Sequence, residues 1–292
     1  MSVEEMLKEY GRIIEPRLES VLSDADSCYD SVVKAMKYSL LSGGKRLRPA
    51  LLLEFFRICG GSPKNAVDFA CAVEMIHTYS LIHDDLPCMD DDSIRRGKPA
   101  CHIAFGEDIA LLSGDGLLTL AFETAAGCDL PAQNVLKAVS VLAQLSGVRG
   151  MIGGQVIDLE CENASVEVDK IKKMCSLKTG ALLKAACTIG CILAGADDEK
   201  IAQARIFAEN IGLAFQIVDD ILDVVGDSQT LGKPIGSDCE NNKSTFVSAL
   251  GVEASKKLAA QYTDTAKAAL GAFGKDAERL LDLADFLVSR EY

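Results

Sequence analysis

The sequence contains no tryptophan and only seven prolines among its 292 residues. Six of these prolines precede residue 132, and none lies between Ala132 and Lys233. Such a long stretch without proline is unusual for a β-rich or loop-rich protein, because proline is common in turns and interrupts helices. Short alternating runs of Val, Thr and Tyr, the usual sign of strands, are also rare. These absences together favour an all-α protein.

Basic residues are also few, with 30 Lys and Arg against 43 Asp and Glu and a formal net charge of −13. A phosphate backbone is normally met by an excess of Lys and Arg, so we expect no nucleic-acid partner. No run of eighteen apolar residues occurs, so we expect no membrane span. The first ten residues are polar and carry acids from Glu4 onward, unlike the basic start of a signal peptide.

The eleven cysteines include no Cys-x-x-Cys pair, and many lie in apolar runs, as Cys71, Cys187 and Cys191 do. A chain of this length does not need disulfides to stabilise its core. We therefore expect reduced, buried thiols and a cytoplasmic location.

Apolar residues recur at helical rather than strand spacing. One helix face is predicted to carry Val73, Ile76, His77, Ser80, Leu81 and Asp84. Ser62-Pro63 is expected to begin that segment, with Ser62 as its N-cap. Residues 169–194 and 201–226 are predicted as helices that are apolar on more than one face, which is typical of the centre of a bundle or of a subunit interface. Because no linker divides the chain, we predict a single domain, residues 1–292, of roughly ten to twelve helices.

Two clusters of aspartates lie at or within apolar helical segments. They are Asp84, Asp85 and Asp90, and Asp219, Asp220 and Asp223. In the second cluster, Asp223 lies four residues after Asp219 and three after Asp220, so these carboxylates share a helix face, where like charges destabilise the helix. Carboxylates crowded in an apolar setting need a counter-charge, which a hard divalent cation supplies. A solvated acidic helix end is the alternative for either cluster alone, and the presence of two clusters favours metal binding.

A diphosphate is a suitable ligand for such sites, because Mg²⁺ takes part of its coordination from substrate phosphates. Basic groups should then accompany the aspartates. The basic motifs are Gly43-Gly44-Lys45-Arg46-Leu47-Arg48-Pro49, Arg95-Arg96-Gly97-Lys98-Pro99, Lys178-Thr179-Gly180, Gly232-Lys233-Pro234 and Lys243. Each motif alone is weak, since most Lys and Arg are simply solvated. An arginine pair beside an aspartate cluster is a stronger sign, because guanidinium groups match phosphate oxygens.

The order of these motifs strongly resembles that of the trans-isoprenyl diphosphate synthases, and among them the bacterial-type farnesyl diphosphate synthases most of all. Two further motifs of the family are present as Gly154-Gln155-x-x-Asp158 and as Gln216-x-x-Asp-Asp-x-x-Asp223, and the resemblance spans about residues 38–245. It implies the all-α isoprenoid synthase fold, a bundle around a central cleft, and a homodimer. The implied reaction joins isopentenyl diphosphate head to tail to dimethylallyl or geranyl diphosphate, giving the C15 product farnesyl diphosphate. The implied cofactor is three Mg²⁺ ions, with Mn²⁺ as the alternative.

The resemblance also implies a role for each motif residue. Asp84, Asp85 and Asp90 would hold two metal ions, and Asp219, with Asp220 or Asp223 in support, a third. The groups that bind the allylic diphosphate and take part in catalysis would be Arg95, Lys178, Thr179, Gln216 and Lys233, with Lys243 as a further allylic diphosphate ligand. Isopentenyl diphosphate would bind at Lys45, Arg48, His77 and Arg96. Without the resemblance, His77 would be read as a core histidine.

Product length depends, by the same resemblance, on residues just before the first aspartate motif. Tyr79 lies five residues before Asp84 and is expected to form the floor of the channel for the growing chain. The helical wheel places Ser80 more nearly beneath Asp84, and simple core packing is the alternative for Tyr79. Geranylgeranyl diphosphate (C20) synthases tend to carry a smaller residue here, and such an enzyme is the alternative function.

Three other classes of protein share part of this pattern. An all-helical metal phosphohydrolase would use His83-Asp84, but that chemistry usually needs several histidines and the chain has three. A terpene cyclase typically lacks the second aspartate motif and the Gly-Gly-Lys motif. A non-catalytic partner subunit should have lost aspartates, and this chain has kept all of them. The synthase is therefore the preferred interpretation.

Overall fold

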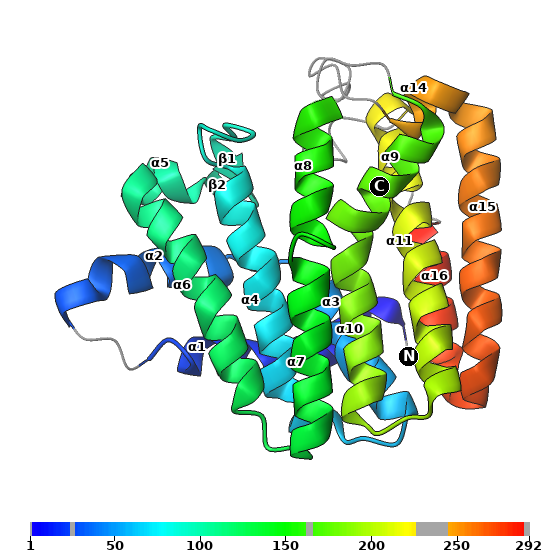
Figure 1. The fold of residues 1–292 in the computed structure, drawn as a ribbon, viewed down its shortest axis with the longest axis horizontal. Helices are drawn as coiled ribbons and strands as arrows, with labels where there is room; N and C mark the ends of the chain where they lie inside the picture. The colour runs from blue at the N-terminus through cyan, green and yellow to red at the C-terminus, as the bar shows by residue number, and fades with distance from the viewer. Residues whose placement is uncertain (1, 24–26, 162–165, 226–244, 289–292) are drawn as a thin grey trace. The chain divides into compact units, whose positions relative to one another are not determined.

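The computed structural model describes residues 2–23, 27–161, 166–225 and 245–288 (Figure 1). Its α-helices are α1 (Val3–Ser20), α2 (Asp30–Leu40), α3 (Leu47–Ile58), α4 (Val67–Asp84), α5 (Cys101–Phe105), α6 (Glu107–Ala126), α7 (Ala132–Ser146), α8 (Met151–Cys161), α9 (Val168–Lys178), α10 (Gly180–Leu193), α11 (Asp198–Val225), α14 (Phe246–Leu250), α15 (Val252–Ala269) and α16 (Glu278–Val288). Short 3₁₀ segments cover Ser27–Tyr29, Pro63–Ala66 and Leu270–Ala277. Lys233 and Lys243 lie outside the described residues.

The all-α prediction is confirmed. Twelve of the described α-helices have 11 residues or more, in agreement with the expected ten to twelve, and α5 and α14 have five each. In the part of the chain that the structure describes, the only strands are the two-residue β1 (Ile94–Arg95) and β2 (Lys98–Pro99), which pair antiparallel.

The chain divides into two compact units. The N-terminal unit comprises Glu4–Ser140 and Ile192–Gly195, and the C-terminal unit comprises Met1–Val3, Val141–Cys191 and Ala196–Tyr292. The prediction of a single domain stays a prediction.

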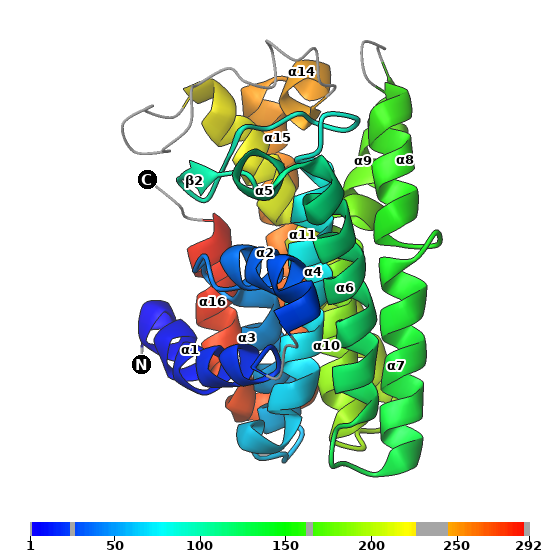
Figure 2. The ribbon, with the colours of Figure 1, turned by 90° about the vertical axis from the view of Figure 1, so that its left-hand side faces the viewer.

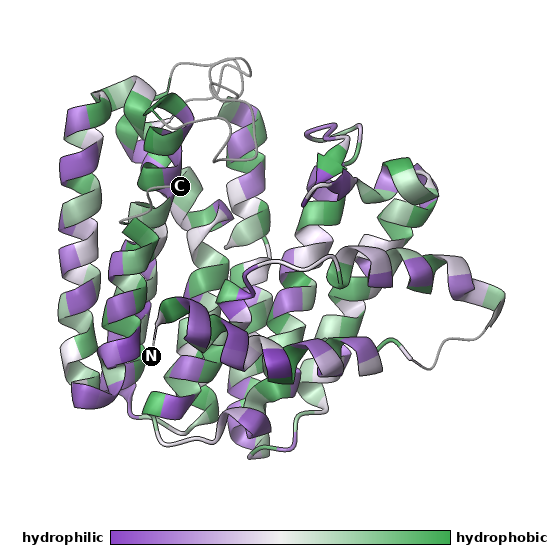
Figure 3. Ribbon diagram, turned by 180° about the vertical axis from the view of Figure 1, so that it is seen from behind, coloured by the Kyte–Doolittle hydropathy of each residue, from purple (hydrophilic) through white to green (hydrophobic). Residues whose placement is uncertain are grey.

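Helix α4 forms the core of the N-terminal unit, with α6, α3 and α2 packed against it (Figures 1 and 2). Eleven of its eighteen residues are buried, because it is apolar on nearly every face. Helix α1 instead has one apolar stripe at a spacing of four residues, Met6, Tyr10, Ile14 and Leu18, and is mainly hydrophilic elsewhere (Figure 3). The expected cap at the start of α4 is wrong in detail. Pro63 begins a 3₁₀ turn before α4, and the Ser62 side chain forms no capping hydrogen bond.

Helix α11 is the centre of the C-terminal unit and packs mainly against α15, with α9 and α16 also in contact (Figure 1). The core around it includes Ile171, Ile217, Ile221 and Phe246. The predicted helix 169–194 is two helices, α9 and α10, which meet at Thr179 with a bend of 47°. This bend places Lys178 at the last position of α9, where a side chain can project beyond the helix.

Two helical stretches, Glu107–Ala126 and Ala132–Cys161, are long and apolar enough to cross a bilayer by length and composition. The expectation of no membrane span therefore stays a prediction. The ten cysteines that the structure describes are all free, and Cys71, Cys187 and Cys191 are buried, as expected. Burial raises the pKa of the Cys187 thiol well above its ordinary value, which keeps it protonated and unreactive.

Candidate functional site

The first aspartate motif begins where α4 ends. The chain folds back after Asp85 so that the Asp90 amide donates to the Asp84 carbonyl at 2.8 Å, and the backbones of these two residues are adjacent. Both side chains are partly exposed. Carboxylate oxygens are the ligands that Mg²⁺ prefers, so Asp84 and Asp90 fit the expected ion. The described residues contain no group of three or more His, Cys, Asp or Glu side chains placed to hold a metal by themselves. An ion at Asp84 and Asp90 would therefore complete its coordination with water or substrate phosphate.

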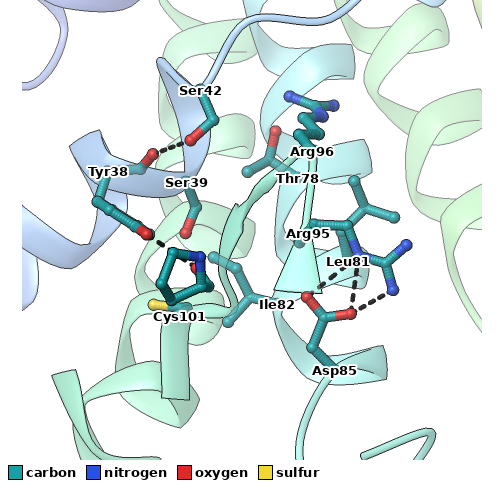
Figure 4. Close-up of a pocket in the computed structure, with 11 residues that line it drawn as sticks. Tyr38, Ser39, Ser42, Thr78, Leu81, Ile82, Asp85, Arg95, Arg96 and Cys101 are labelled. Carbon is teal, nitrogen blue, oxygen red and sulfur yellow. Dashed lines mark hydrogen bonds and ion pairs between the residues drawn. The ribbon is translucent and has the colours of Figure 1, made fainter. Parts of the chain in front are cut away.

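Asp85 is oriented differently from its neighbours in the motif. Its side chain is 2% exposed, and its Oδ1 accepts a hydrogen bond of 2.8 Å from Arg95 Nε (Figure 4). Arg95 also donates to Asp92 Oδ2 at 2.8 Å. Burial raises the pKa of Asp85, while the hydrogen bonds from Arg95 act in the opposite direction. Asp85 is thus the counter-ion of Arg95 in this structure, and its role as a metal ligand stays a prediction.

A hairpin carries the two adjacent arginines. Arg95 is in β1, and Arg96 follows with a left-handed backbone, φ 54°. The two side chains point apart, Arg95 toward Asp85 and Arg96 away from it (Figure 4). Helix α2 anchors the hairpin, because the Tyr38 hydroxyl donates to the Pro99 carbonyl at 2.8 Å. Tyr38, Asp85 and both arginines line a small pocket between α2, α4 and the hairpin.

The Gly-Gly-Lys segment covers Arg96. Gly43 and Gly44 have φ values of 80° and 119°, which L side chains rarely adopt. A Cβ on Gly44 would lie 3.2 Å from Arg96 Cζ, so glycine allows the loop to approach the guanidinium. Arg96 Nη1 in turn donates to the Gly43 carbonyl at 2.5 Å. The motif therefore places its backbone against Arg96.

Arg48 and His77 lie together, as the predicted isopentenyl site requires. Arg48 Nη1 lies 3.3 Å from His77 Nε2. Burial and the neighbouring Arg48 both lower the pKa of His77 well below its ordinary value, so His77 is neutral and accepts this hydrogen bond. The buried Nε of Arg48 has no hydrogen-bond partner among the described residues. A buried guanidinium N–H without an acceptor is costly. The site therefore suits an anion that supplies the missing acceptor.

The second aspartate motif, on α11, also divides into inward and outward carboxylates. Asp220 is 5% exposed and accepts hydrogen bonds from Gln216 Nε2 at 3.1 Å and from the Phe246 amide at 2.9 Å. Asp219 and Asp223 are only partly buried. Since both oxygens of Asp220 bind protein donors, Asp219 and Asp223 are the better candidates for a metal ion.

The bend between α9 and α10 carries Lys178 and Thr179. Each of them contacts a residue of another motif. Lys178 Nζ forms an ion pair with Asp158 Oδ2 on α8. Thr179 Oγ1 donates to Gln216 Oε1 at 3.3 Å. Because Gln216 also donates to Asp220, its amide is fixed with the oxygen toward Thr179. Sequence reasoning gave Asp158 no role, although its place in the Gly-Gln-x-x-Asp motif was the available signal.

Tyr79 and Ser80 occupy different environments on α4. Tyr79 is 5% exposed, packs edge-on against His83 with ring centroids 5.7 Å apart, and has a buried hydroxyl without a partner in the described chain. Burial raises its pKa to about 12. Ser80 is partly buried and donates to the His77 carbonyl at 2.9 Å. The side chain of Tyr79 is bulky and fixed, as a channel floor would need to be.

Fold and residues thus define an all-α protein with outward carboxylates in each unit and a cluster of guanidinium groups in which the buried Nε of Arg48 has no acceptor among the described residues. The chain belongs to the polyprenyl synthetase family, whose family model matches residues 30–278.

Individual relatives and solved structures agree with this family. The chain is 43% identical over 289 residues to the farnesyl diphosphate synthase of Bacillus subtilis, covering 98% of this chain and 97% of that protein. It is 43% identical to the geranylgeranyl diphosphate synthase of Cyanophora paradoxa, covering 97% and 95%. The structure of geranylgeranyl pyrophosphate synthetase from Pyrococcus horikoshii superposes with a TM-score of 0.91 at 31% identity, covering 99% of this chain and 98% of that one.

Proposed function

We propose that the protein is a farnesyl diphosphate synthase, a Mg²⁺-dependent prenyltransferase. It would join isopentenyl diphosphate to dimethylallyl diphosphate and then to geranyl diphosphate. The observation that carries the proposal is the cluster of Arg48, Arg96 and neutral His77 with its missing acceptor. The similarity to farnesyl diphosphate synthases over nearly the whole chain supports the same reaction.

The cluster around Arg48 suits isopentenyl diphosphate, which must bind without ionising. It supplies guanidinium and imidazole groups, and its neutral His77 adds no further charge. Arg48 Nη1 lies beside His77 Nε2, and Arg96 Nη1 donates to the Gly43 carbonyl. We assign Arg48, Arg96 and His77 to this substrate, with the exposed Lys45 at the rim.

The allylic diphosphate must leave, and the residues assigned to it stabilise the departing charge. Mg²⁺ at Asp84, Asp90, Asp219 and Asp223 would neutralise the developing negative charge. Lys178 would add a fixed cation, which Asp158 orients. The oxygens of Thr179 and Gln216 would offer dipoles to the developing carbocation without a strong nucleophile that could trap it.

Condensation can be distinguished from hydrolysis by its products. With geranyl diphosphate, isopentenyl diphosphate and Mg²⁺ together, we expect one equivalent of diphosphate released for each new C–C bond. Either substrate alone should release almost nothing. Release of phosphate or diphosphate from one substrate alone would instead support the phosphohydrolase alternative.

We further propose a homodimer in the cytoplasm. Leu111 and Leu112 on α6 and Leu136 on α7, all within the N-terminal unit, have exposed side chains, with Leu136 70% exposed. Exposed leucines on neighbouring helices are typical of a surface covered by another subunit. Analytical ultracentrifugation should give twice the chain mass of 31.1 kDa, and a monomer at micromolar concentration would contradict the proposal.

A further inference from the structure

Glu74 is a buried carboxylate of the N-terminal unit to which the proposed function gives no role. It lies in an apolar stretch of α4, ten residues before Asp84, and is 2% exposed. A buried carboxylate is costly unless it is paired. Its Oε1 accepts a hydrogen bond of 2.6 Å from Arg46 Nη1 and lies 3.7 Å from Arg96 Nη2. Glu74 therefore contacts one arginine of the proposed isopentenyl site and a second arginine beside it.

Arg46 connects Glu74 to the Gly-Gly-Lys segment. Although it belongs to that basic motif, Arg46 is only 4% exposed and points inward, with a left-handed backbone, φ 49°. Its Nε donates to Glu15 at 2.7 Å and its Nη2 to the Leu40 carbonyl at 2.8 Å. It is therefore fixed by α1, α2 and α4 together. Because Arg46 is the residue directly before α3, its position sets where α3 begins and where Arg48 lies.

The charges around Glu74 need a common counter-ion. The positive charges of Arg46, Arg48 and Arg96 each lower the pKa of His77. Arg96 also lowers the pKa of Arg48, and Arg46 lowers the pKa of Arg96. Burial lowers the pKa of Arg96, and the Glu74 carboxylate is the main influence that raises it. Glu74 likewise opposes the effect of burial on the pKa of Arg48. One carboxylate thus stabilises three guanidinium groups that would otherwise repel one another.

We propose that Glu74 is a positioning residue for the isopentenyl diphosphate site, holding Arg96 directly and Arg48 through Arg46. The proposal rests on the proposed function, since it names the anion that Arg48 and Arg96 bind. The proposal predicts the direction in which anion binding changes when Glu74 is replaced. If Glu74 contributed only negative charge, its removal would strengthen anion binding. If it positions the arginines, its removal weakens binding although the site becomes more positive.

The test is steady-state kinetics of Glu74→Gln, with isopentenyl and geranyl diphosphate varied in turn. We expect the KM for isopentenyl diphosphate to rise about tenfold, which corresponds to the loss of one charge-assisted hydrogen bond. The KM for geranyl diphosphate and kcat should change less than about twofold. Arg48→Ala gives the scale of the effect, because it removes a group assigned to the same substrate.

Glu54→Gln is the matched control. Glu54 is also fully buried in the N-terminal unit, where it pairs with Arg57 at 2.7 Å and accepts a hydrogen bond from the Tyr10 hydroxyl. It should lower stability without a selective change in KM. An equal rise for both substrates in Glu74→Gln, an unchanged or lower KM for isopentenyl diphosphate, or the same selective rise in Glu54→Gln would overturn the role of Glu74.

Two further measurements keep the result interpretable. If Glu74→Gln does not fold, Glu74→Asp keeps the charge but withdraws it from Arg46. It should still raise the KM for isopentenyl diphosphate selectively, and an unchanged KM would overturn the proposal. The wild-type protein is assayed first. Failure of the wild type to condense the two substrates would overturn the proposed function, whereas an active wild type with an unaffected Glu74→Gln overturns only the positioning role.

Discussion

Individual aspartates within one motif differ in what they contact, although their charges are identical. In the second motif, Asp220 accepts two hydrogen bonds inside the C-terminal unit, whereas Asp219 is partly exposed. Adjacent residues on a helix point about 100° apart, so only one of the pair can face the core. The motif as written in the sequence does not say which one, and the choice depends on where α14 places the Phe246 amide.

This difference predicts opposite results for two similar substitutions. Asp219→Asn should lower kcat at least about hundredfold while leaving the thermal midpoint unchanged or higher, because it removes a metal ligand and relieves repulsion. Asp220→Asn should lower the free energy of unfolding by about 1–3 kcal/mol. Both oxygens of Asp220 accept hydrogen bonds from N–H groups, and the NH₂ group of asparagine would face one of these donors instead. Activity at saturating Mg²⁺ and calorimetry check both. A fully active Asp219→Asn would exclude Asp219 as a metal ligand.

His77 should make stability depend on pH. Its pKa in the folded protein is lowered well below the ordinary value of about 6.5. Below about pH 6.5 the unfolded chain therefore binds a proton at His77 that the folded protein does not. The stability that neutral His77 contributes is complete above this pH and is lost as the pH falls. Urea unfolding between pH 5 and 8 should show a shallower pH dependence for His77→Gln than for wild type. An identical slope would show that folding does not change the pKa of His77.

At the scale of elements, the contact between α8 and α9 sets the position of Lys178. A Cβ on Gly154 of α8 would lie 2.1 Å from the Lys178 backbone nitrogen, a distance that real contacts essentially never show. Glycine thus allows α8 to approach α9 closely enough for Asp158 to reach Lys178. The Gly-Gln-x-x-Asp motif therefore combines a packing residue with an ion-pair partner.

Gly154→Ala should accordingly separate the two helices. We expect a loss of about 1–3 kcal/mol in unfolding free energy, as for overpacked cores, and a fall in kcat as Lys178 moves. Gly11→Ala on α1 is the control, because nothing lies within 4 Å of a Cβ there, and it should be neutral or slightly stabilising. Equal stability of the two variants would show that the C-terminal unit tolerates a wider α8–α9 spacing.

Helix α4 also contains the predicted determinant of product length. Tyr79 packs against His83, one turn further along the helix. Tyr79→Ala should open this position and shift the main product from C15 toward C20 or longer, whereas Tyr79→Phe should keep C15. Chromatography of the dephosphorylated products measures the shift. An active Tyr79→Ala that still stops at C15 would show that Tyr79 only packs the core.

At the scale of the whole molecule, the sequence was sufficient for the helical class and the order of the motifs, because both depend on local patterns. Proline-free apolar segments predicted the long helices, and α11 lies almost where it was expected. Features that depend on contacts distant in sequence were missed. Arg46 was grouped with the basic residues expected to accompany the aspartates, yet Glu15 and Glu74 draw it inward. Helix 169–194 was predicted unbroken, because a single Thr-Gly step does not by itself signal a bend.

The central claim is that this chain makes farnesyl diphosphate, and product analysis of the wild-type protein tests it most directly. The purified enzyme is incubated with Mg²⁺, labelled isopentenyl diphosphate and, in separate reactions, dimethylallyl, geranyl or farnesyl diphosphate. Our account predicts C15 as the main product from the first two primers and almost no extension of the third. Efficient extension of farnesyl diphosphate to C20, or no labelled allylic product from any primer, would contradict it.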